Sequence, residues 1–172
     1  MSEKMKIGLE IERKYIIAMP DIDILAAQQD YTASSITQIY IASEPGETRR
    51  VRRRSYADRT VYFETSKRRV DNMSSEESER EITPREYETL AAQILPDTVP
   101  VEKIRYTFLY HGQTFEIDVY PLWTQSAIME TELSSRDMAV TMPPFIRIIR
   151  EVTGDKAYSN AAMSRKFPPE DK

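Results

Sequence analysis

The sequence predicts a mainly antiparallel α+β protein, an eight-stranded closed or nearly closed β-barrel with peripheral helices. Polar and apolar residues alternate with a period of two along most of the chain, and this period indicates strands with two different faces. Turn residues separate the alternating segments at short intervals, which is typical of hairpins. Charged residues recur at every second position in most of these segments. Antiparallel strands with few helices are typical of a barrel or a strongly curved sheet.

The alternating segments define eight strands. Two connections, Tyr110-His111-Gly112-Gln113 and Ser55-Tyr56-Ala57-Asp58, are predicted to be tight hairpin turns. The predicted strands cover residues 7–17, 36–42, 47–54, 59–67, 76–82, 101–110, 113–120 and 125–133.

The clearest helix is predicted to run from Pro84 to about Leu95. Thr83 suits the N-cap, Pro84 the first helical position and Glu86 the third, which together form a capping box. Shorter helices are expected at residues 21–28, 135–140, directly after Pro144, and 158–165. Residues 69–75 show no period and are expected to form a mobile loop, placed to act as a lid over one mouth of the barrel. The tail, 168–172, is expected to fray.

The composition is that of a globular protein with an unusually large charged fraction. Of 172 residues, 40% are hydrophobic and 30% charged, and the length predicts one domain, 1–172, with a frayed end at 165–172. No long apolar run or signal-peptide pattern occurs, so no membrane partner is expected and the cytoplasm is the expected location. The chain has no cysteine and one histidine, His111, which excludes disulfides, thiolate metal sites and a His-based triad. Any chemistry must therefore use carboxylates, lysine and arginine.

Charged side chains at positions i and i+2 occur in most of the predicted strands. In the segment EIERKYII, Glu10, Glu12 and Lys14 share one face of a strand. The same spacing recurs in Arg50/Arg52/Arg54, Thr65/Lys67, Glu77/Glu79/Glu81, Lys103/Arg105, Glu116/Asp118 and Glu130/Glu132. On any single strand a solvated outer face is the ordinary explanation. Across the set, most strands carry charges of a single sign, and these like charges lie only ~7 Å apart. A charged lumen explains both the alternation and this separation of the signs between strands.

A charged lumen of this kind predicts two classes of ligand. Oxygen ligands without histidine or cysteine suit hard cations such as Mg²⁺ or Mn²⁺. The arginines of RRVRRR, with lysines on neighbouring strands, suit several phosphate groups at once, because guanidinium binds phosphate in a bidentate way and lysine acts as a point charge. The lumen therefore predicts a site for a divalent metal and a polyphosphate.

With these residues the sequence resembles the CYTH family, also called the triphosphate tunnel metalloenzymes, over about residues 7–165. Glu10-Ile11-Glu12-Arg13-Lys14 matches the Glu-x-Glu-x-Lys signature of the first strand. Glu64 is a departure, since an apolar residue is usual before the Thr-x-Lys segment. The later segments that follow in the family's order are Arg50-Val51-Arg52, Thr65-Ser66-Lys67, Glu77-Ser78-Glu79, Lys103-Ile104-Arg105, Glu116-Ile117-Asp118, Glu130-Thr131-Glu132 and the closing segment 152–160.

The resemblance implies an eight-stranded tunnel that binds a triphosphate and divalent metal. It implies as metal ligands Glu10, Glu12, Glu130 and Glu132, with Asp118 close by. It implies as phosphate-binding residues Lys14, Arg50, Arg52, Lys67, Lys103, Arg105 and Lys156. Candidates for direct catalytic roles are Lys14, which would hold the water or donate a proton, and Glu79 and Glu116, which would orient water or basic groups; Glu77 is a weaker candidate. Expected on the surface are Arg49, Arg53, Arg68 and Arg69, with Arg54 at the rim.

The activity that the resemblance implies is metal-dependent hydrolysis of inorganic, thiamine or nucleoside triphosphate. The alternative is a class IV-type adenylyl cyclase, which makes cyclic AMP from ATP, although no residue pattern marks an adenine site. A non-catalytic polyphosphate binder is a further alternative. The run RRVRRR also fits a nucleic-acid patch, but a pI near 5.2 and acidic strands in the same sheet oppose it, so no nucleic-acid partner is expected. The sequence carries no signal for an oligomeric state.

Overall fold

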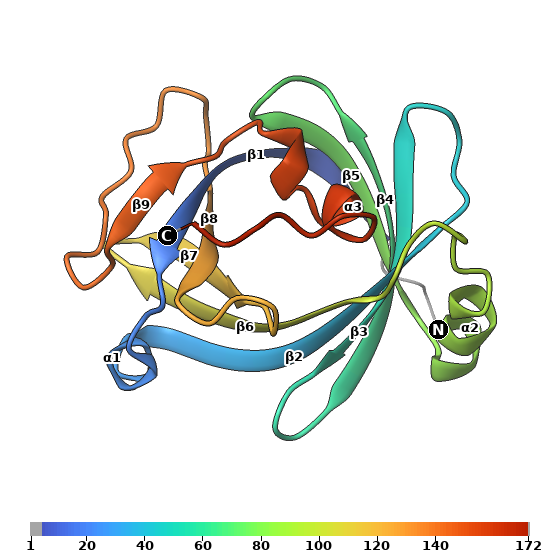
Figure 1. The fold of residues 1–172 in the computed structure, drawn as a ribbon, viewed down its shortest axis with the longest axis horizontal. Coiled ribbons are helices and arrows are strands. Elements are labelled where there is room, and N and C mark those ends of the chain that lie inside the picture. Colours follow the sequence, from blue (N-terminus) through green and yellow to red (C-terminus); the bar gives the residue numbers. More distant parts are fainter. Residues whose placement is uncertain (1–4, 172) are drawn as a thin grey trace.

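A computed structural model of the chain describes residues 5–171, and one long antiparallel sheet dominates it (Figure 1). The strands are β1 (Met5–Ala18), β2 (Gln29–Ile41), β3 (Glu47–Ser55), β4 (Thr60–Arg69), β5 (Ser74–Ile82), β6 (Val101–Tyr110), β7 (Gln113–Val119), β8 (Ser126–Glu132) and β9 (Ile148–Glu151). Their order is β5-β4-β3-β2-β6-β7-β8-β1-β9, and β5 also pairs with β1, so β1 to β8 close into a barrel. The predicted eight-stranded barrel is confirmed, and β9 is an addition that the sequence did not reveal.

Strand β1 closes the barrel because different parts of it pair with different strands. Met5–Ile11 pair with β5, Glu12–Ala18 pair with β8, and the end of the strand also pairs with β9. Backbone hydrogen bonds extend both pairings by one residue. The N–H of Glu12 donates at 3.0 Å to the carbonyl of Met73, which directly precedes β5, and the N–H of Val152, which directly follows β9, donates at 2.9 Å to the carbonyl of Lys14. The charged residues of β1 therefore lie at the seam where the β5 wall and the β8 wall meet.

The predicted hairpins are present. His111 and Gly112 join β6 to β7 with φ of 49° and 73°, the left-handed values that a two-residue hairpin requires at both positions. A longer turn, residues 56–59, joins β3 to β4, and the residue pair next to it is Ser55 and Thr60. Strand β2 begins seven residues earlier than the predicted 36–42; Asp30 has a φ of 54°, and the register with β6 shifts between Gln29 and Thr32. This irregular start interrupts the alternation on which the prediction rested.

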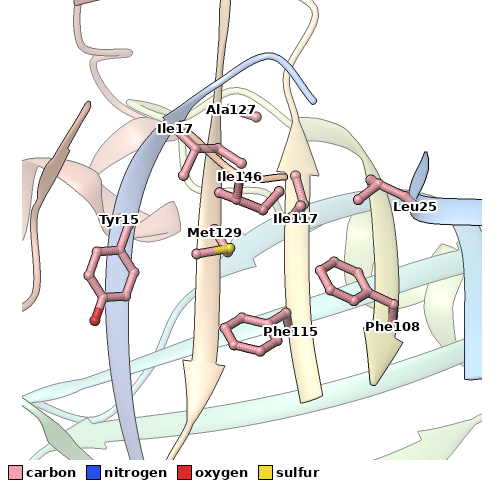
Figure 2. Packing of buried hydrophobic residues seen from close by; sticks show 9 residues of the cluster. All are labelled: Tyr15, Ile17, Leu25, Phe108, Phe115, Ile117, Ala127, Met129 and Ile146. Carbon is pink, nitrogen blue, oxygen red and sulfur yellow. The ribbon is translucent and has the colours of Figure 1, made fainter. Parts of the chain in front are cut away.

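The largest apolar cluster packs against the outside of the barrel wall (Figure 2). It includes Tyr15 and Ile17 of β1, Phe115 and Ile117 of β7, and Met129 of β8, all of which have the parity opposite to the charged residues of the same strands. The cover on this side is Leu25 from helix α1 and Ile146 from an irregular segment. This cluster thus lies outside the wall, where the charged lumen predicts an apolar core.

A second apolar cluster fills one end of the barrel. Inward residues such as Ile16 and Ile128 pack with Trp123 and with Tyr158 and Met163 from the C-terminal segment, which crosses the barrel opening in Figure 1. The tail that the sequence predicts to fray is instead held there: Trp123 Nε1 donates to the Pro168 carbonyl at 3.1 Å and Arg150 pairs with Asp171 at 2.7 Å. These contacts close one end of the lumen.

The helices are short and peripheral: α1 (Ile22–Ala26), α2 (Pro84–Ala91), α3 (Asn160–Met163) and the 3-10 turn η1 (Lys156–Tyr158). The predicted cap of α2 is confirmed, since the Thr83 hydroxyl accepts from the Glu86 N–H at 3.1 Å. The helices predicted at 135–140 and after Pro144 are wrong: both segments form isolated turns, and the segment around Pro144 packs against the outer cluster through Phe145 and Ile146 instead. Within residues 5–171, no helix is long and apolar enough to cross a membrane.

Candidate active site

A cavity of about 860 Å³ occupies the lumen of the barrel. Its acidic lining residues are Glu10, Glu12, Glu47, Asp71, Glu77, Glu79, Glu116, Glu130, Glu132 and Asp155. Its basic lining residues are Lys6, Lys14, Arg50, Arg52, Lys67, Arg69, Arg105, Lys156 and Arg165. All site residues predicted from the sequence line this cavity except Lys103 and Asp118. The structure therefore brings most of the charges that alternate along the strands together in one lumen.

Like-charged carboxylates lie next to one another in this cavity. The pKa of Glu12 is raised to about 7, mainly by the neighbouring carboxylate of Glu130 and then by burial. The pKa of Glu10 is raised to about 8 by burial and by Glu77 across the β1–β5 pair. Both shifts have the same meaning: the negative charge is poorly compensated, and a cation would stabilise it.

The donor set is compatible with one kind of metal site. Among residues 5–171, no three carboxylate or histidine side chains converge closely enough to hold a metal ion by themselves. Magnesium rarely uses an all-protein cage; it is usually held by one or two carboxylates together with substrate phosphates and water. The pairs Glu10/Glu77 and Glu12/Glu130 supply donors in that number, so the residues present fit a divalent cation that binds with its substrate.

Lys14 projects into the same cavity from the seam. Its Nζ donates to the Tyr158 carbonyl at 3.1 Å and lies 3.2 Å from Glu130 Oε1. Burial alone would lower the pKa of Lys14, but Glu130 and Glu12 outweigh this effect and leave the pKa raised. Lys14 is therefore a fixed positive charge rather than a group that exchanges a proton near neutral pH.

The wall opposite the carboxylate pairs is basic, and two of its arginines have no ion-pair partner. Neither Arg50 nor Arg52 forms an ion pair with a carboxylate in the described part of the chain, and the buried Nε of Arg50 has no hydrogen-bond partner there. On β4, Lys67 Nζ is 3.9 Å from the nearest oxygen of Glu12. Since buried donors normally find partners, this wall is suited to an anion with several oxygen atoms.

The inward charges of β6 and β7 form a different arrangement. Lys103 Nζ lies 2.8 Å from Asp118 Oδ2, and Arg105 Nε donates to Asp118 Oδ1 at 2.8 Å. Arg105 also contacts Glu116 at 2.8 Å. Burial alone would raise the pKa of Asp118, but Arg105 and Lys103 hold it far below its usual range. Both oxygens of Asp118 are thus occupied, and neither Lys103 nor Asp118 reaches the cavity.

The remaining predicted residues take separate positions. Glu79 accepts a hydrogen bond from the Thr65 hydroxyl at 3.0 Å. Glu132 is the register partner of Glu12 at the end of β8. Lys156 is exposed at the start of η1 and reaches the cavity from the C-terminal segment. The arginines expected on the surface stay outside, except Arg69, which has the parity of Lys67 and lines the mouth.

Some lining and supporting residues escaped the sequence analysis. Gln38 of β2 accepts two hydrogen bonds from Arg52. Asn160 accepts from the Tyr120 hydroxyl at 2.9 Å and lies 3.4 Å from Lys103 Nζ. Gln38 has inward parity within ITQIY, but it is neutral, so a search for alternating charges passes over it. Asn160 belongs to a helix that enters the lumen only through the tertiary fold.

The predicted loop at 69–75 is reduced to residues 70–73 because β4 and β5 extend into it. Asp71 Oδ1 accepts from the N–H groups of Met73 and Ser74 at 2.9 Å and 2.8 Å, and Asp71 pairs with Arg136 at 2.5 Å. A Cβ added to Gly154, whose φ is +78°, would lie 2.8 Å from the Cβ of Asn72. The loop therefore packs tightly on the turn before Lys156, at the edge of the cavity.

Comparison with known proteins was made on sequence and on fold. No protein-family model matches the chain. The chain is 33% identical to an inorganic triphosphatase of Nitrosomonas europaea over 168 residues, which cover 92% of this chain and 99% of the relative. A crystal structure of an inorganic triphosphatase superposes with a TM-score of 0.59 at 31% identity, covering 93% of this chain and 97% of that one. A Pyrococcus horikoshii protein shares the fold, with a TM-score of 0.56, 19% identity and coverage of 74% and 80%.

Proposed function

Because the chain belongs to the CYTH family of triphosphate tunnel metalloenzymes, we propose that it hydrolyses a triphosphate inside its barrel. The observation that carries the proposal is the opposition, within one cavity, of unpaired arginines on β3 and crowded carboxylates on β1, β5 and β8. The similarity to an inorganic triphosphatase supports this activity and makes inorganic triphosphate the first substrate to test.

The cofactor that we propose is Mg²⁺ or Mn²⁺. Glu12 and Glu130 would hold it at the β1–β8 side, and Glu10 and Glu132 extend the same acidic surface. A divalent cation bound here supplies Lewis-acid polarisation of the phosphoryl oxygens and offsets their charge. The raised pKa values of Glu10 and Glu12 support this assignment, because they report charge that a cation would relieve.

The basic residues are proposed to bind and orient the triphosphate. Arg50 and Arg52 would present guanidinium donors to the phosphate oxygens, Lys67 would add a further positive charge, and Lys156 approaches from the C-terminal segment. Phosphoryl transfer depends mostly on positioning and on electrostatic stabilisation of the equatorial oxygens. Arg50 and Arg52, which lack carboxylate partners, are placed to provide both.

Three proposed roles differ from those implied by the family resemblance alone. Asp118 is proposed to position Arg105 rather than to bind metal, because both of its oxygens form ion pairs. Lys103 is proposed to support the Asp118–Arg105 pair, since it contacts Asp118 and does not line the cavity. Lys14, held by Glu130 and the Tyr158 carbonyl, contributes fixed charge. Glu79 remains the carboxylate proposed to orient water, because Glu116 is bound to Arg105.

The test is a substrate panel followed by ³¹P NMR. The protein is incubated with tripolyphosphate, ATP or thiamine triphosphate, each with Mg²⁺, Mn²⁺ or EDTA. We expect tripolyphosphate to yield orthophosphate and pyrophosphate with metal and no product in EDTA; Glu12→Gln is the control for the site. Cyclic AMP as the main product from ATP, with tripolyphosphate untouched, would replace the hydrolase by the cyclase. Binding of tripolyphosphate without turnover under any condition would leave a polyphosphate-binding protein.

A further inference from the structure

Gln38 lies near the centre of β2, on the inward face, with 0% of its surface exposed. Its register partner on β3 is Arg52. Gln38 Oε1 accepts hydrogen bonds from Arg52 Nε at 2.9 Å and from Arg52 Nη2 at 2.5 Å. The Nε2 of Gln38 has no partner among the described residues. The contact of Gln38 with Arg52 is therefore the only hydrogen bonding that this buried amide makes within residues 5–171.

Arg52 differs from the other buried arginine of the lumen in its acceptor. Both side chains are 7% exposed as residues and both line the cavity. Arg105 is bound by the carboxylates of Asp118 and Glu116, and its pKa is raised. Arg52 is bound by a neutral amide; burial, with Arg50 and Arg105 adding to it, lowers the pKa of Arg52 to about 9. One guanidinium is thus neutralised by its neighbours and the other is not.

The identity of the acceptor decides what the guanidinium can offer to a ligand. A guanidinium has five N–H donors in a rigid plane, and two hydrogen bonds to one oxygen fix the orientation of that plane. A carboxylate in the same place would fix it equally well, but it would also cancel the positive charge that attracts an anion. An amide fixes the orientation and leaves the charge available.

We propose that Gln38 is a positioning residue that holds Arg52 in place for phosphate while leaving its charge uncompensated. This inference rests on the proposed function, since it concerns the affinity of the same cavity for a triphosphate. It predicts that a residue which never touches the substrate controls how strongly the basic wall binds it.

The decisive variant is Gln38→Glu, which changes an amide to a carboxylate of nearly the same shape. We expect calorimetric titration with tripolyphosphate in EDTA to show at least about tenfold weaker binding, because the new carboxylate pairs with Arg52. The melting temperature of the ligand-free protein should stay the same or rise, because a buried cation gains a partner. A purely structural role would move stability and affinity in the same direction.

Two further variants control for charge and for folding. Thr37→Glu adds the same charge one residue away on the outer face, opposite Arg53, and should leave tripolyphosphate affinity within about twofold of wild type. Gln38→Met keeps the volume without the acceptor; it should lower the melting temperature and weaken binding by about three- to tenfold. In an Arg52→Ala background, Gln38→Met should weaken binding no further.

The outcomes separate this inference from the proposed function. Equal tripolyphosphate affinity of wild type and Gln38→Glu would overturn the role of Gln38 while leaving the hydrolase intact. Parallel loss of melting temperature and affinity in Gln38→Glu, or a further loss of affinity when Gln38→Met is added to Arg52→Ala, would also overturn it. Wild-type protein that neither binds nor hydrolyses tripolyphosphate would overturn both.

Discussion

Two groups of inward-facing charged residues lie in one barrel and differ in how their buried charges are compensated. On β6 and β7, Lys103, Arg105, Asp118 and Glu116 pair with one another at 2.8 Å. On β1, β5 and β8, carboxylates face carboxylates, and the inward arginines Arg50 and Arg52 of β3 form no ion pair with a carboxylate in the described chain. All of these residues have the same inward parity on their strands.

The difference shows that parity alone does not identify a binding residue. The paired group is complete without a ligand, so its charges act on the site only through Arg105. The other group, whose arginines are unpaired, is compensated only in part, by Lys14 at Glu130 and by Lys67 near Glu12. A cation together with a polyphosphate anion would complete the compensation. The molecule thus has a supporting region and a binding region within one ring of strands.

The largest effect is expected in the paired group. Asp118→Asn should destabilise the protein by about 3–5 kcal/mol, because it leaves Lys103 and Arg105 buried without their main counter-charge. Denaturant unfolding measures the loss, with Glu116→Gln as a control that should cost less because Glu116 is more exposed. A variant with wild-type stability that loses Mn²⁺ binding would instead make Asp118 a metal ligand.

A smaller effect on a different observable is expected in the unpaired group. Arg52→Ala should weaken tripolyphosphate binding by about 1.5–3 kcal/mol, the scale of charge-assisted hydrogen bonds. Arg53→Ala, one residue away on the outer face, should change it little. Isothermal titration distinguishes the two; identical affinities for both variants would show that the lumen does not bind the anion through β3.

The crowded carboxylates predict a pH dependence with a defined sign. The pKa of Glu12 is raised from 4.5 to about 7 in the folded state, so between these values the folded state binds more protons than the unfolded state. Wild-type stability should therefore fall relative to Glu12→Gln as pH rises from about 4.5 to 7, by up to about 3 kcal/mol, and level off above 7.

Denaturant unfolding in EDTA across this pH range measures the difference in unfolding free energy between Glu12→Gln and wild type. At pH 8, saturating Mn²⁺ should make the wild type the more stable of the two, because it stabilises only the wild type. A variant less stable than wild type in EDTA at pH 8 would indicate that Glu12 has a structural partner instead of a repulsive neighbour.

The smallest effect is expected for an ion pair outside the barrel. Arg13 and Glu151 form a pair at 2.8 Å, with side chains 32% and 40% exposed. Glu151→Gln should cost no more than about 1 kcal/mol, because solvent already screens exposed pairs. Comparing this value with that of Asp118→Asn in the same unfolding experiment tests whether burial, rather than the ion pair itself, causes the large effect.

Most of the barrel could be predicted because its inner face is charged. The spacing of Glu10, Glu12 and Lys14, and of Arg50 and Arg52, fixes both the strand period and the face that meets the lumen. The helix cap at Thr83 was equally predictable, because a single side-chain hydrogen bond defines it. Strand β9 and the position of the tail could not be predicted, since they depend on contacts with β1, Trp123 and Arg150 far away in the sequence.

Most of the charged residues that line the cavity were predictable from the sequence, but the ion pairs between them were not. Asp118 and Glu130 both point inward from neighbouring strands, yet only the register of β6 and β7 places Arg105 against Asp118. Gln38 was missed because it is uncharged, although its hydrogen bonds orient Arg52. Pairing depends on register and on distance across strands, which alternation along one strand does not encode.

The most direct test of the account is calorimetric titration of the wild-type protein with tripolyphosphate, once in EDTA and once with Mg²⁺. We predict one saturable binding event in EDTA, carried by the basic wall, and at least about tenfold tighter binding with Mg²⁺, because the cation relieves the paired carboxylates and the anion together. No saturable binding in either condition would contradict the account, because the unpaired charges of the lumen would then not form a triphosphate site.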